Sequence, residues 1–305
     1  MSKNPDLGKT GNSVWNQPFI DELNANFFPN MDVNTMQNEQ DRFLEFYPEW
    51  IASSKLNQFR GLEDFPKRYV SLGVTQALDW WHNWCLSQGL RLKMFRGEYP
   101  YNRDVWLGEY MGWDKSIDDI GLDRGDAVII SVPFSGSGRK HERWKWLIEE
   151  CNTKDIPVFV DCAWFGTCFD VEVKLNHPCI KMVAFSTGKG LSCGNWRSGI
   201  VFSRLADDDR CSLELQTEWR HGIHLNVAIA NHLMAKYGPD TMPKKYMEAH
   251  AAVCEHYGFE TTNTIHIAVA PQTPEWREYH RDETFNRVNI AKAIKRWKSN
   301  GNFAQ

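Results

Sequence analysis

FSTGKGLSCGNWRSG, residues 185–199, is the most informative stretch of this 305-residue chain. The apolar run 182–185 predicts a buried strand, Ser186 follows it, and Lys189 stands between two glycines. Burial lowers the pKa of a lysine, and the neutral amine that results can form a Schiff base. Ser186, together with Arg197 eight residues after the lysine, can hold a phosphate. A glycine-rich loop with a solvated lysine is the alternative interpretation.

This pattern resembles the cofactor-lysine segment of the fold-type-I pyridoxal-phosphate enzymes, the aspartate aminotransferase superfamily. The matching positions are Ser186, Lys189, Gly194, Arg197 and Gly199. A Walker-type phosphate loop is excluded, because Val183 and Gly190 stand where that motif needs glycine and Ser or Thr. The resemblance implies that pyridoxal 5'-phosphate is the cofactor, with Lys189 as its Schiff-base residue.

Gly73, Val74 and Thr75 stand at a predicted junction between a short strand and a helix over residues 75–89. The first backbone N–H groups of a helix are unpaired and favour an anion. The resemblance implies that these three residues bind the cofactor phosphate. Without the resemblance, Thr75 would be interpreted as a helix N-cap.

Tyr99 precedes Pro100 just after a predicted strand at 92–95. The resemblance implies that its ring stacks on the cofactor, as the aromatic residue of a P-x-[WYF]-P loop does in the family. Gly97 occupies the position of the first proline of that loop, so the match is incomplete. An ordinary turn aromatic is the alternative.

The β-branched run 127–132, the amphipathic segment 139–151 and the apolar run 157–160 alternate as strand, helix and strand. This alternation predicts an α/β fold with a mostly parallel sheet covered on both faces. Asp161 ends the second strand, where open α/β sheets bind ligands. The resemblance implies that Asp161 pairs with the pyridine nitrogen and that Trp164 lies near the phenolic oxygen. Without it, Asp161 could equally cap a turn.

The asparagine of the family's N-P-x-G segment is absent, because the chain has Val132, Pro133 and Phe134 at this place. The usual hydrogen bond to the phenolic oxygen of the cofactor is therefore in doubt. Further along, Arg287 lies in a segment, FNRVNIA, that resembles the family's carboxylate-binding segment. The resemblance implies that Arg287 binds the substrate carboxylate bidentately. A surface arginine on a strand is the alternative.

The composition describes an ordinary globular protein, with 42% hydrophobic residues and a net charge of −4. No basic tail indicates a nucleic-acid partner, and no apolar run approaches the roughly 20 residues needed to span a bilayer. Histidines and cysteines show no metal-ligand spacing. The eight cysteines are interpreted as reduced thiols, and we expect a cytoplasmic protein.

Three segments are predicted: an N-terminal arm (1–45), a large α/β cofactor domain (46–205) and a small α+β domain (206–305). The resemblance implies an aminotransferase that acts on amino acids and keto acids, with Lys189, Asp161 and Tyr99 as catalytic residues, and a homodimer. A lyase or cyclase of the same fold stays open, as does a degenerate member that serves as a binding scaffold.

Overall fold

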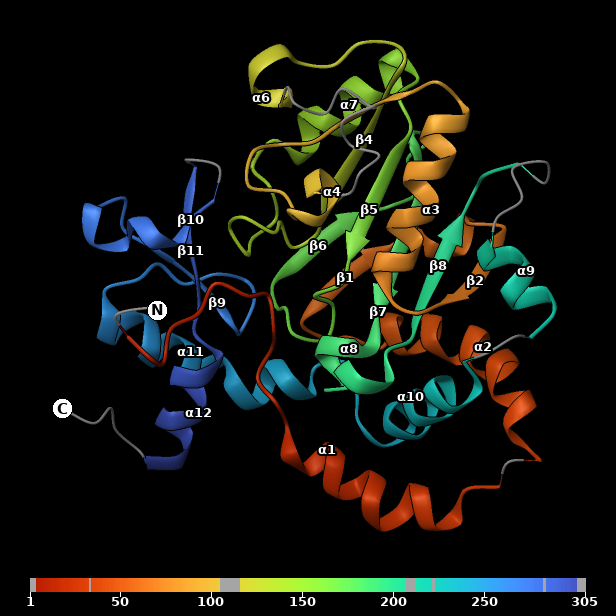
Figure 1. The fold of residues 1–305 in the computed structure, drawn as a ribbon, viewed down its shortest axis with the longest axis vertical. Helices are drawn as coiled ribbons and strands as arrows, with labels where there is room; N and C mark the ends of the chain where they lie inside the picture. Colours follow the sequence, from red (N-terminus) through yellow and green to blue (C-terminus); the bar gives the residue numbers. More distant parts are fainter. Residues whose placement is uncertain are drawn as a thin grey trace.

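A six-stranded sheet lies at the centre of the computed structural model, which describes residues 4–32, 34–104, 116–206, 212–220, 223–281 and 284–300 (Figure 1). Its strands, in the order β2-β8-β7-β5-β4-β3 across the sheet, are β2 (Lys67–Ser71), β8 (Gly199–Ser203), β7 (Ile180–Ser186), β5 (Val158–Cys162), β4 (Asp126–Ser131) and β3 (Arg91–Lys93). β7, β5, β4 and β3 are parallel neighbours, and β8 runs antiparallel to both β2 and β7. The prediction of an α/β fold with a mostly parallel sheet is confirmed.

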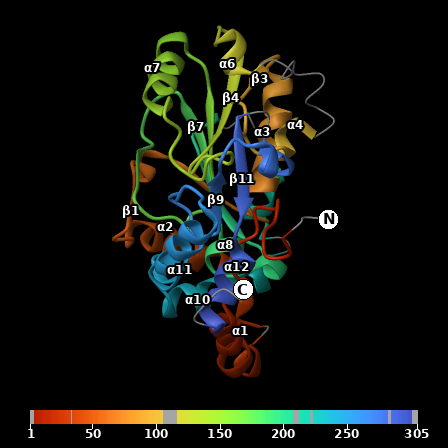
Figure 2. The same cartoon turned by 90° about the vertical axis from the view of Figure 1, so that its left-hand side faces the viewer.

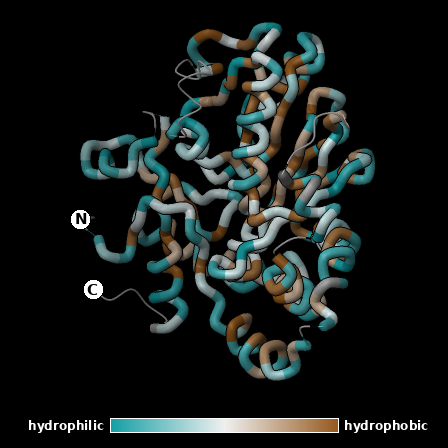
Figure 3. Tube along the Cα trace, turned by 45° about the vertical axis from the view of Figure 1, so that its right-hand side comes forward, coloured by the Kyte–Doolittle hydropathy of each residue, from teal (hydrophilic) through white to brown (hydrophobic). Residues whose placement is uncertain are grey.

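Both faces of this sheet are buried, as successive residues of β4 show. Val128 and Ile130 belong to one apolar cluster, whereas Ala127 and Ile129 belong to another on the opposite face. The helix α3 (Val74–Ser87) packs on the second face. On the first face lie α2 (Glu39–Ala52), α7 (Trp144–Lys154) and α10 (His224–Lys236). Figure 2 shows α7 and α3 on opposite sides of the sheet, and Figure 3 shows hydrophobic residues along the central strands.

Helix α7 begins five residues later than its sequence predicts. Its buried residues Trp144, Leu147, Ile148 and Cys151 are the predicted apolar face. The preceding residues form a turn instead, in which the Phe134 N–H donates to the carbonyl of Arg139 at 2.7 Å. After this turn the Arg143 N–H donates to His141 Nδ1 at 3.1 Å rather than to a helical carbonyl, and the helix begins at residue 144.

The C-terminal part forms a small α+β unit, as predicted. Its antiparallel sheet has the order β10 (His280–Arg281), β11 (Phe285–Asn289) and β9 (Ile267–Ala270). The helix α11 (Thr241–Tyr257) packs against α12 (Ala291–Asn300). The N-terminal arm joins this sheet, because Gly8 and Asn289 exchange two backbone hydrogen bonds of 2.9 and 2.8 Å. The three predicted segment boundaries stay predictions.

The arm is less irregular than its sequence suggests, since short helices fill much of residues 17–38. A parallel pair of strands, β1 (Asn57–Arg60) and β6 (Val171–Lys174), lies beside the main sheet. The remaining short helices of the described chain are α1 (Gln17–Glu22), η1 (Leu23–Phe27), η2 (Phe28–Asn30), η3 (Met36–Asn38), η4 (Leu62–Asp64), α4 (Tyr101–Asp104), α6 (Ile117–Ile120), α8 (Thr187–Gly190), η5 (Gly194–Trp196), α9 (Ser212–Glu218) and η6 (Pro274–Tyr279).

The described residues contain no helix that is long and apolar enough to cross a bilayer. Within the same residues, no group of His, Cys, Asp and Glu is arranged to hold a metal ion. The cysteines that the structure describes are buried free thiols.

Candidate active site

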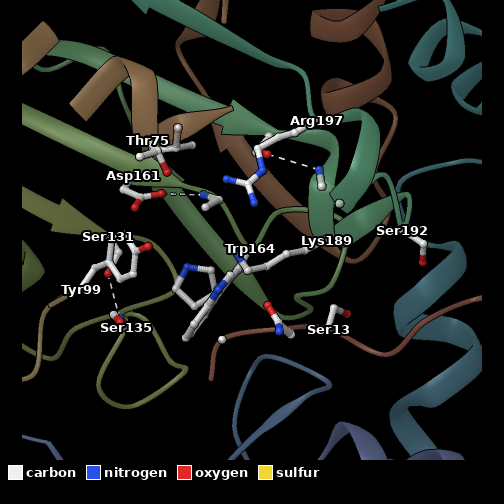
Figure 4. Close-up of a pocket in the computed structure, with 18 of the residues that line it drawn as sticks. Ser13, Thr75, Tyr99, Ser131, Ser135, Asp161, Trp164, Lys189, Ser192 and Arg197 are labelled. Carbon is white, nitrogen blue, oxygen red and sulfur yellow. Dashed lines mark hydrogen bonds between the residues drawn. The ribbon is translucent and has the colours of Figure 1, made fainter. Parts of the chain in front are cut away.

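A cavity of about 490 Å³ opens at the carboxyl ends of three neighbouring parallel strands. Ser131 ends β4, Asp161 is the penultimate residue of β5, and Ser186 ends β7; all three line the cavity. Because neighbouring parallel strands end at the same edge of a sheet, polar residues at these positions meet. Figure 4 shows Thr75, Asp161, Lys189 and Arg197 around this cavity.

The structure brings the candidate residues from the sequence to this one cavity. Those that line it are Val74, Thr75, Tyr99, Asp161, Trp164, Ser186, Lys189, Arg197 and Arg287. Gly73 is the N-cap residue of α3 and lies next to the side chain of Arg197. Thr75 is therefore a residue of the helix rather than its N-cap. Lys189 lies in α8 and its partly buried side chain lines the cavity, so it is not the solvated loop residue of the alternative interpretation.

The amine of Lys189 is poorly solvated and lies among other charges. Burial lowers its pKa to about 8; Asp161 raises it, and Arg197 and Arg287 lower it further. With that pKa, roughly one amine in ten is neutral at pH 7. An ordinary exposed lysine is almost wholly charged at this pH. Lys189 can therefore act as a nucleophile or a base near neutral pH.

Asp161 is a buried carboxyl group that still carries charge at neutral pH. Burial raises its pKa to about 6, against the backbone N–H of Ala163 and the charge of Lys189, which both lower it. That N–H donates to Asp161 Oδ1 at 2.7 Å, which fixes the carboxyl group at the end of β5. A protonated ring nitrogen placed in the cavity would find its counter-charge here.

The groups near the start of α3 suit a phosphate. Backbone N–H groups of the first turn of this 14-residue helix lack helical partners. Arg197 lies beside them, and no carboxylate in the described part of the chain pairs with its guanidinium. The hydroxyl of Ser186 accepts a hydrogen bond from the Gly188 N–H at 3.2 Å and keeps its own proton for a further acceptor.

Arg287 is buried, with 4% of its surface exposed, and is not the surface residue of the alternative interpretation. Its Nη1 donates to the carbonyl of Ser135 at 3.1 Å, and its Nη2 donates to the carbonyl of Lys9 at 2.7 Å. Its Nε is buried without a hydrogen-bond partner. Burial and the nearby charge of Arg281 lower the pKa of Arg287, so that a carboxylate ligand would stabilise both its charge and its free N–H.

Two aromatic residues form further walls of the cavity. The ring of Tyr99 is partly exposed and stacks on that of Tyr101, with centroids 5.8 Å apart. Trp164 is buried and meets His266 edge to face at 5.3 Å, while the guanidinium of Arg287 lies 5.9 Å from its ring. Both rings thus have defined positions, Trp164 the more firmly of the two.

Sequence reasoning missed several residues at the site. Glu98, Ser131 and Ser135 form a hydrogen-bonded group beside Tyr99, and residues 11–15 of the arm form one wall of the cavity. The position of Glu98 directly before Tyr99 was the one available signal, and no periodicity marks the arm. The missing asparagine has no polar replacement in either register, because Val132 is fully buried outside the cavity lining and Pro133 lines the cavity.

Comparison with solved structures shows the same fold in proteins of very different sequence. A structure of MppP, described as soaked with the product 2-ketoarginine, has a TM-score of 0.63 and 12% identity, over 94% of this chain and 96% of its own. Alanine aminotransferase from Pyrococcus furiosus has a TM-score of 0.62 and 11% identity, over 93% and 86%. Aromatic-amino-acid aminotransferase from Burkholderia pseudomallei, described as covalently bound to pyridoxal phosphate, has a TM-score of 0.61 and 12% identity, over 95% and 89%.

The chain therefore has the fold of the type-I pyridoxal-phosphate aminotransferases, and the resemblance predicted from the sequence is confirmed at the level of the fold. No family model matches the sequence. No curated protein matches it either. Identities this low establish the fold and leave the reaction to be argued from the site.

Proposed function

We propose that this chain is a pyridoxal-phosphate-dependent aminotransferase that acts on an α-amino acid. The observation that supports it best is the pairing of Lys189 and Asp161 within one cavity. Each perturbs the pKa of the other; Asp161 lies near the end of β5, and Lys189 lies in α8, which directly follows β7. Perturbed, mutually interacting groups in a cavity are typical of active sites.

The residues present fit the phosphate, the ring nitrogen and the aldehyde of pyridoxal phosphate. Arg197, Ser186 and the start of α3 would hold its phosphate, and Asp161 would hold its ring nitrogen. Tyr99 would face its ring, and Lys189 would bind its aldehyde carbon. When bound, this cofactor supplies a carbonyl group that condenses with amines and a ring that withdraws electrons from the substrate α-carbon.

Each residue of the site would then have a separate role in the reaction. Lys189 would be the base that moves the α-proton of the substrate, for which a pKa of about 8 is suitable. Arg287 orients the substrate carboxylate through the N–H that no described group occupies. Asp161 maintains the charge of the ring nitrogen, and Tyr99 fixes the tilt of the ring.

The decisive experiment mixes the protein, saturated with pyridoxal phosphate, with single amino acids. We expect at least one to remove the visible absorption of the bound cofactor and to release its keto acid, and a second keto acid to restore the absorption. Release of ammonia, or of a cyclised or β-eliminated product, would instead indicate the lyase or cyclase. A protein that stays colourless with added cofactor would be the binding scaffold.

Gly73 offers a test of the phosphate end of the site. Its φ is +85°, and a Cβ there would lie 2.6 Å from Arg197 Cδ and 3.1 Å from Ser186 Oγ. Gly73→Ala is therefore expected to raise the dissociation constant of pyridoxal phosphate about 10- to 100-fold, equivalent to about 1.4–2.8 kcal/mol, in an absorbance titration.

Gly89 provides the matched control for Gly73→Ala. Its φ of +64° is also positive, but no atom lies within 4 Å of the added Cβ. Gly89→Ala should cost stability alone, about 1 kcal/mol, and leave cofactor binding within twofold of the parent protein. Equal cofactor affinities in the two variants would refute the proposed phosphate site.

A homodimer in the cytoplasm is the remaining part of the proposal. Trp15, which lines the cavity, is 39% exposed, and Trp219 is 58% exposed, as is common for aromatic residues that a partner covers. Buried free thiols support a reducing compartment.

A further inference from the structure

Glu98 is a buried carboxyl group beside the candidate active site that the proposed reaction does not use. Only 3% of its surface is exposed, and it lies behind the wall of the cavity. It accepts hydrogen bonds from the backbone N–H of Tyr99 and from that of Ser131, both at 2.7 Å. The hydroxyl of Ser131 donates a third. Three donors from two separate segments therefore converge on one side chain.

The hydrogen bonds continue from Ser131 to the substrate end of the cavity. Ser131 Oγ accepts from the Ser135 N–H at 2.8 Å, which Figure 4 shows as a dashed line. Ser135 in turn accepts from Arg287 Nη1, through its carbonyl at 3.1 Å and its hydroxyl at 3.3 Å. An unbroken chain of hydrogen bonds thus connects Glu98 with Arg287.

Burying this carboxyl group is costly, since burial raises its pKa to about 7 against the hydrogen bonds that lower it. The two residues that it reaches, Tyr99 and Arg287, both line the cavity. The hydrogen-bonded residues Ser131 and Ser135 flank Val132 and Pro133, the segment in which the asparagine typical of the fold family is absent. Glu98 therefore supplies a polar side chain that fixes residues 99 and 131 next to a segment from which the usual asparagine is absent.

We propose that Glu98 is a positioning residue of the candidate active site, which fixes Tyr99 directly and Arg287 through Ser131 and Ser135. This inference rests on the proposed function, because it assigns Tyr99 to the cofactor ring and Arg287 to the substrate carboxylate. The competing explanation is that Glu98 merely satisfies the two backbone N–H groups and stabilises the fold.

Glu98→Gln tests the proposal, because a glutamine keeps the size of the side chain but has one acceptor oxygen in place of two. Ser131→Ala removes only the hydroxyl that connects Glu98 with Ser135. Glu63→Gln is the matched control, since Glu63 is exposed and lies outside the cavity. Thermal unfolding and the absorbance of bound pyridoxal phosphate establish that each variant folds and holds the cofactor.

The informative probe is 2-methylalanine, an amino acid that has no α-hydrogen and so can bind without reacting further. Its dissociation constant, read from the visible spectrum, is expected to rise about tenfold in Glu98→Gln and in Ser131→Ala. The double variant should lose no more than about the larger single loss, because both substitutions interrupt one chain. The visible circular dichroism of the bound cofactor should change in Glu98→Gln, which disturbs Tyr99, and less in Ser131→Ala.

Unchanged affinity for 2-methylalanine in both single variants would overturn the proposal and leave Glu98 a structural residue. If Glu98→Gln fails to fold, Ser131→Ala alone decides by the same measurement. Failure of the proposed function has a different signature: the parent protein would then bind neither pyridoxal phosphate nor 2-methylalanine, and the inference would fall with it.

Discussion

Lys189→Ala is expected to abolish the visible absorption that pyridoxal phosphate acquires on binding to this protein. The partly buried amine of Lys189 has a pKa of about 8 and is the one amine of the described residues that lines the cavity. Borohydride reduction should attach the cofactor to the parent protein at residue 189, detected by mass spectrometry, and leave the variant unlabelled. Turnover should fall by about 10²–10⁴-fold or more, since the general base is lost as well.

Lys174→Ala, on the exposed side of β6, is the control for this experiment and should keep the absorption. A Lys189→Ala variant that still becomes labelled on reduction would assign the cofactor to another lysine and refute the site.

The stability of the cofactor-free protein provides a check that Lys189→Ala folds. The pKa of Lys189 is lower in the folded chain than its ordinary value of 10.5, so charging the buried amine destabilises the fold below pH 8. The penalty, about 1–3 kcal/mol, decreases as the pH rises from 8 towards 10.5. The variant lacks this penalty and should unfold at a higher temperature than the parent protein at pH 7.

Asp161→Asn is expected to change two rates in opposite directions. Loss of the buried counter-charge for the ring nitrogen should slow turnover by about 10²–10³-fold, equivalent to roughly 3–4 kcal/mol. Asp161 also raises the pKa of Lys189, so its removal lowers that pKa below 8 and increases the neutral fraction of the amine at pH 7. Capture of pyridoxal phosphate at saturating concentration should therefore become faster at pH 7.

Stopped-flow absorbance between pH 6 and 10 measures this second effect. Capture requires the neutral amine, so its rate rises with pH through the pKa of Lys189, with a midpoint near 8 in the parent protein and lower in the variant. Asp64→Asn, at an exposed position, should change neither rate. If capture also slowed in an Asp161→Asn variant that unfolds at the same temperature as the parent protein, the assigned coupling between Asp161 and Lys189 would be refuted.

Local sequence patterns determined much of the fold. The run 127–132 is mostly β-branched and apolar because β4 is buried on both faces. The composition of such a strand is therefore enough to predict its burial. The start of α7 was misplaced because a turn at 134–139 overrides the helical periodicity of the residues that precede Trp144. The short helices between residues 17 and 38 escaped prediction because they lack a sustained apolar period.

Some residues of the candidate site could be predicted from the sequence, and others could not. Asp161 and Ser186 could be predicted because strand ends place residues at a known edge of the sheet. Glu98 could not, because its partners Ser131 and Tyr99 come together only when two segments 33 residues apart meet. The contact of Arg287 with the carbonyl of Lys9 depends on a still longer separation, for which no local pattern exists.

That last contact bears on how the protein is made. Lys9 and Arg287 are 278 positions apart, and Gly8 pairs with Asn289 beside them. During synthesis on the ribosome, the sheet strands up to residue 203 can associate well before the segment around residue 287 emerges. Contacts between such distant segments form slowly, because a long loop must close first. We therefore expect the nascent chain to acquire its wall of arm residues last, after the segment around residue 287 has emerged.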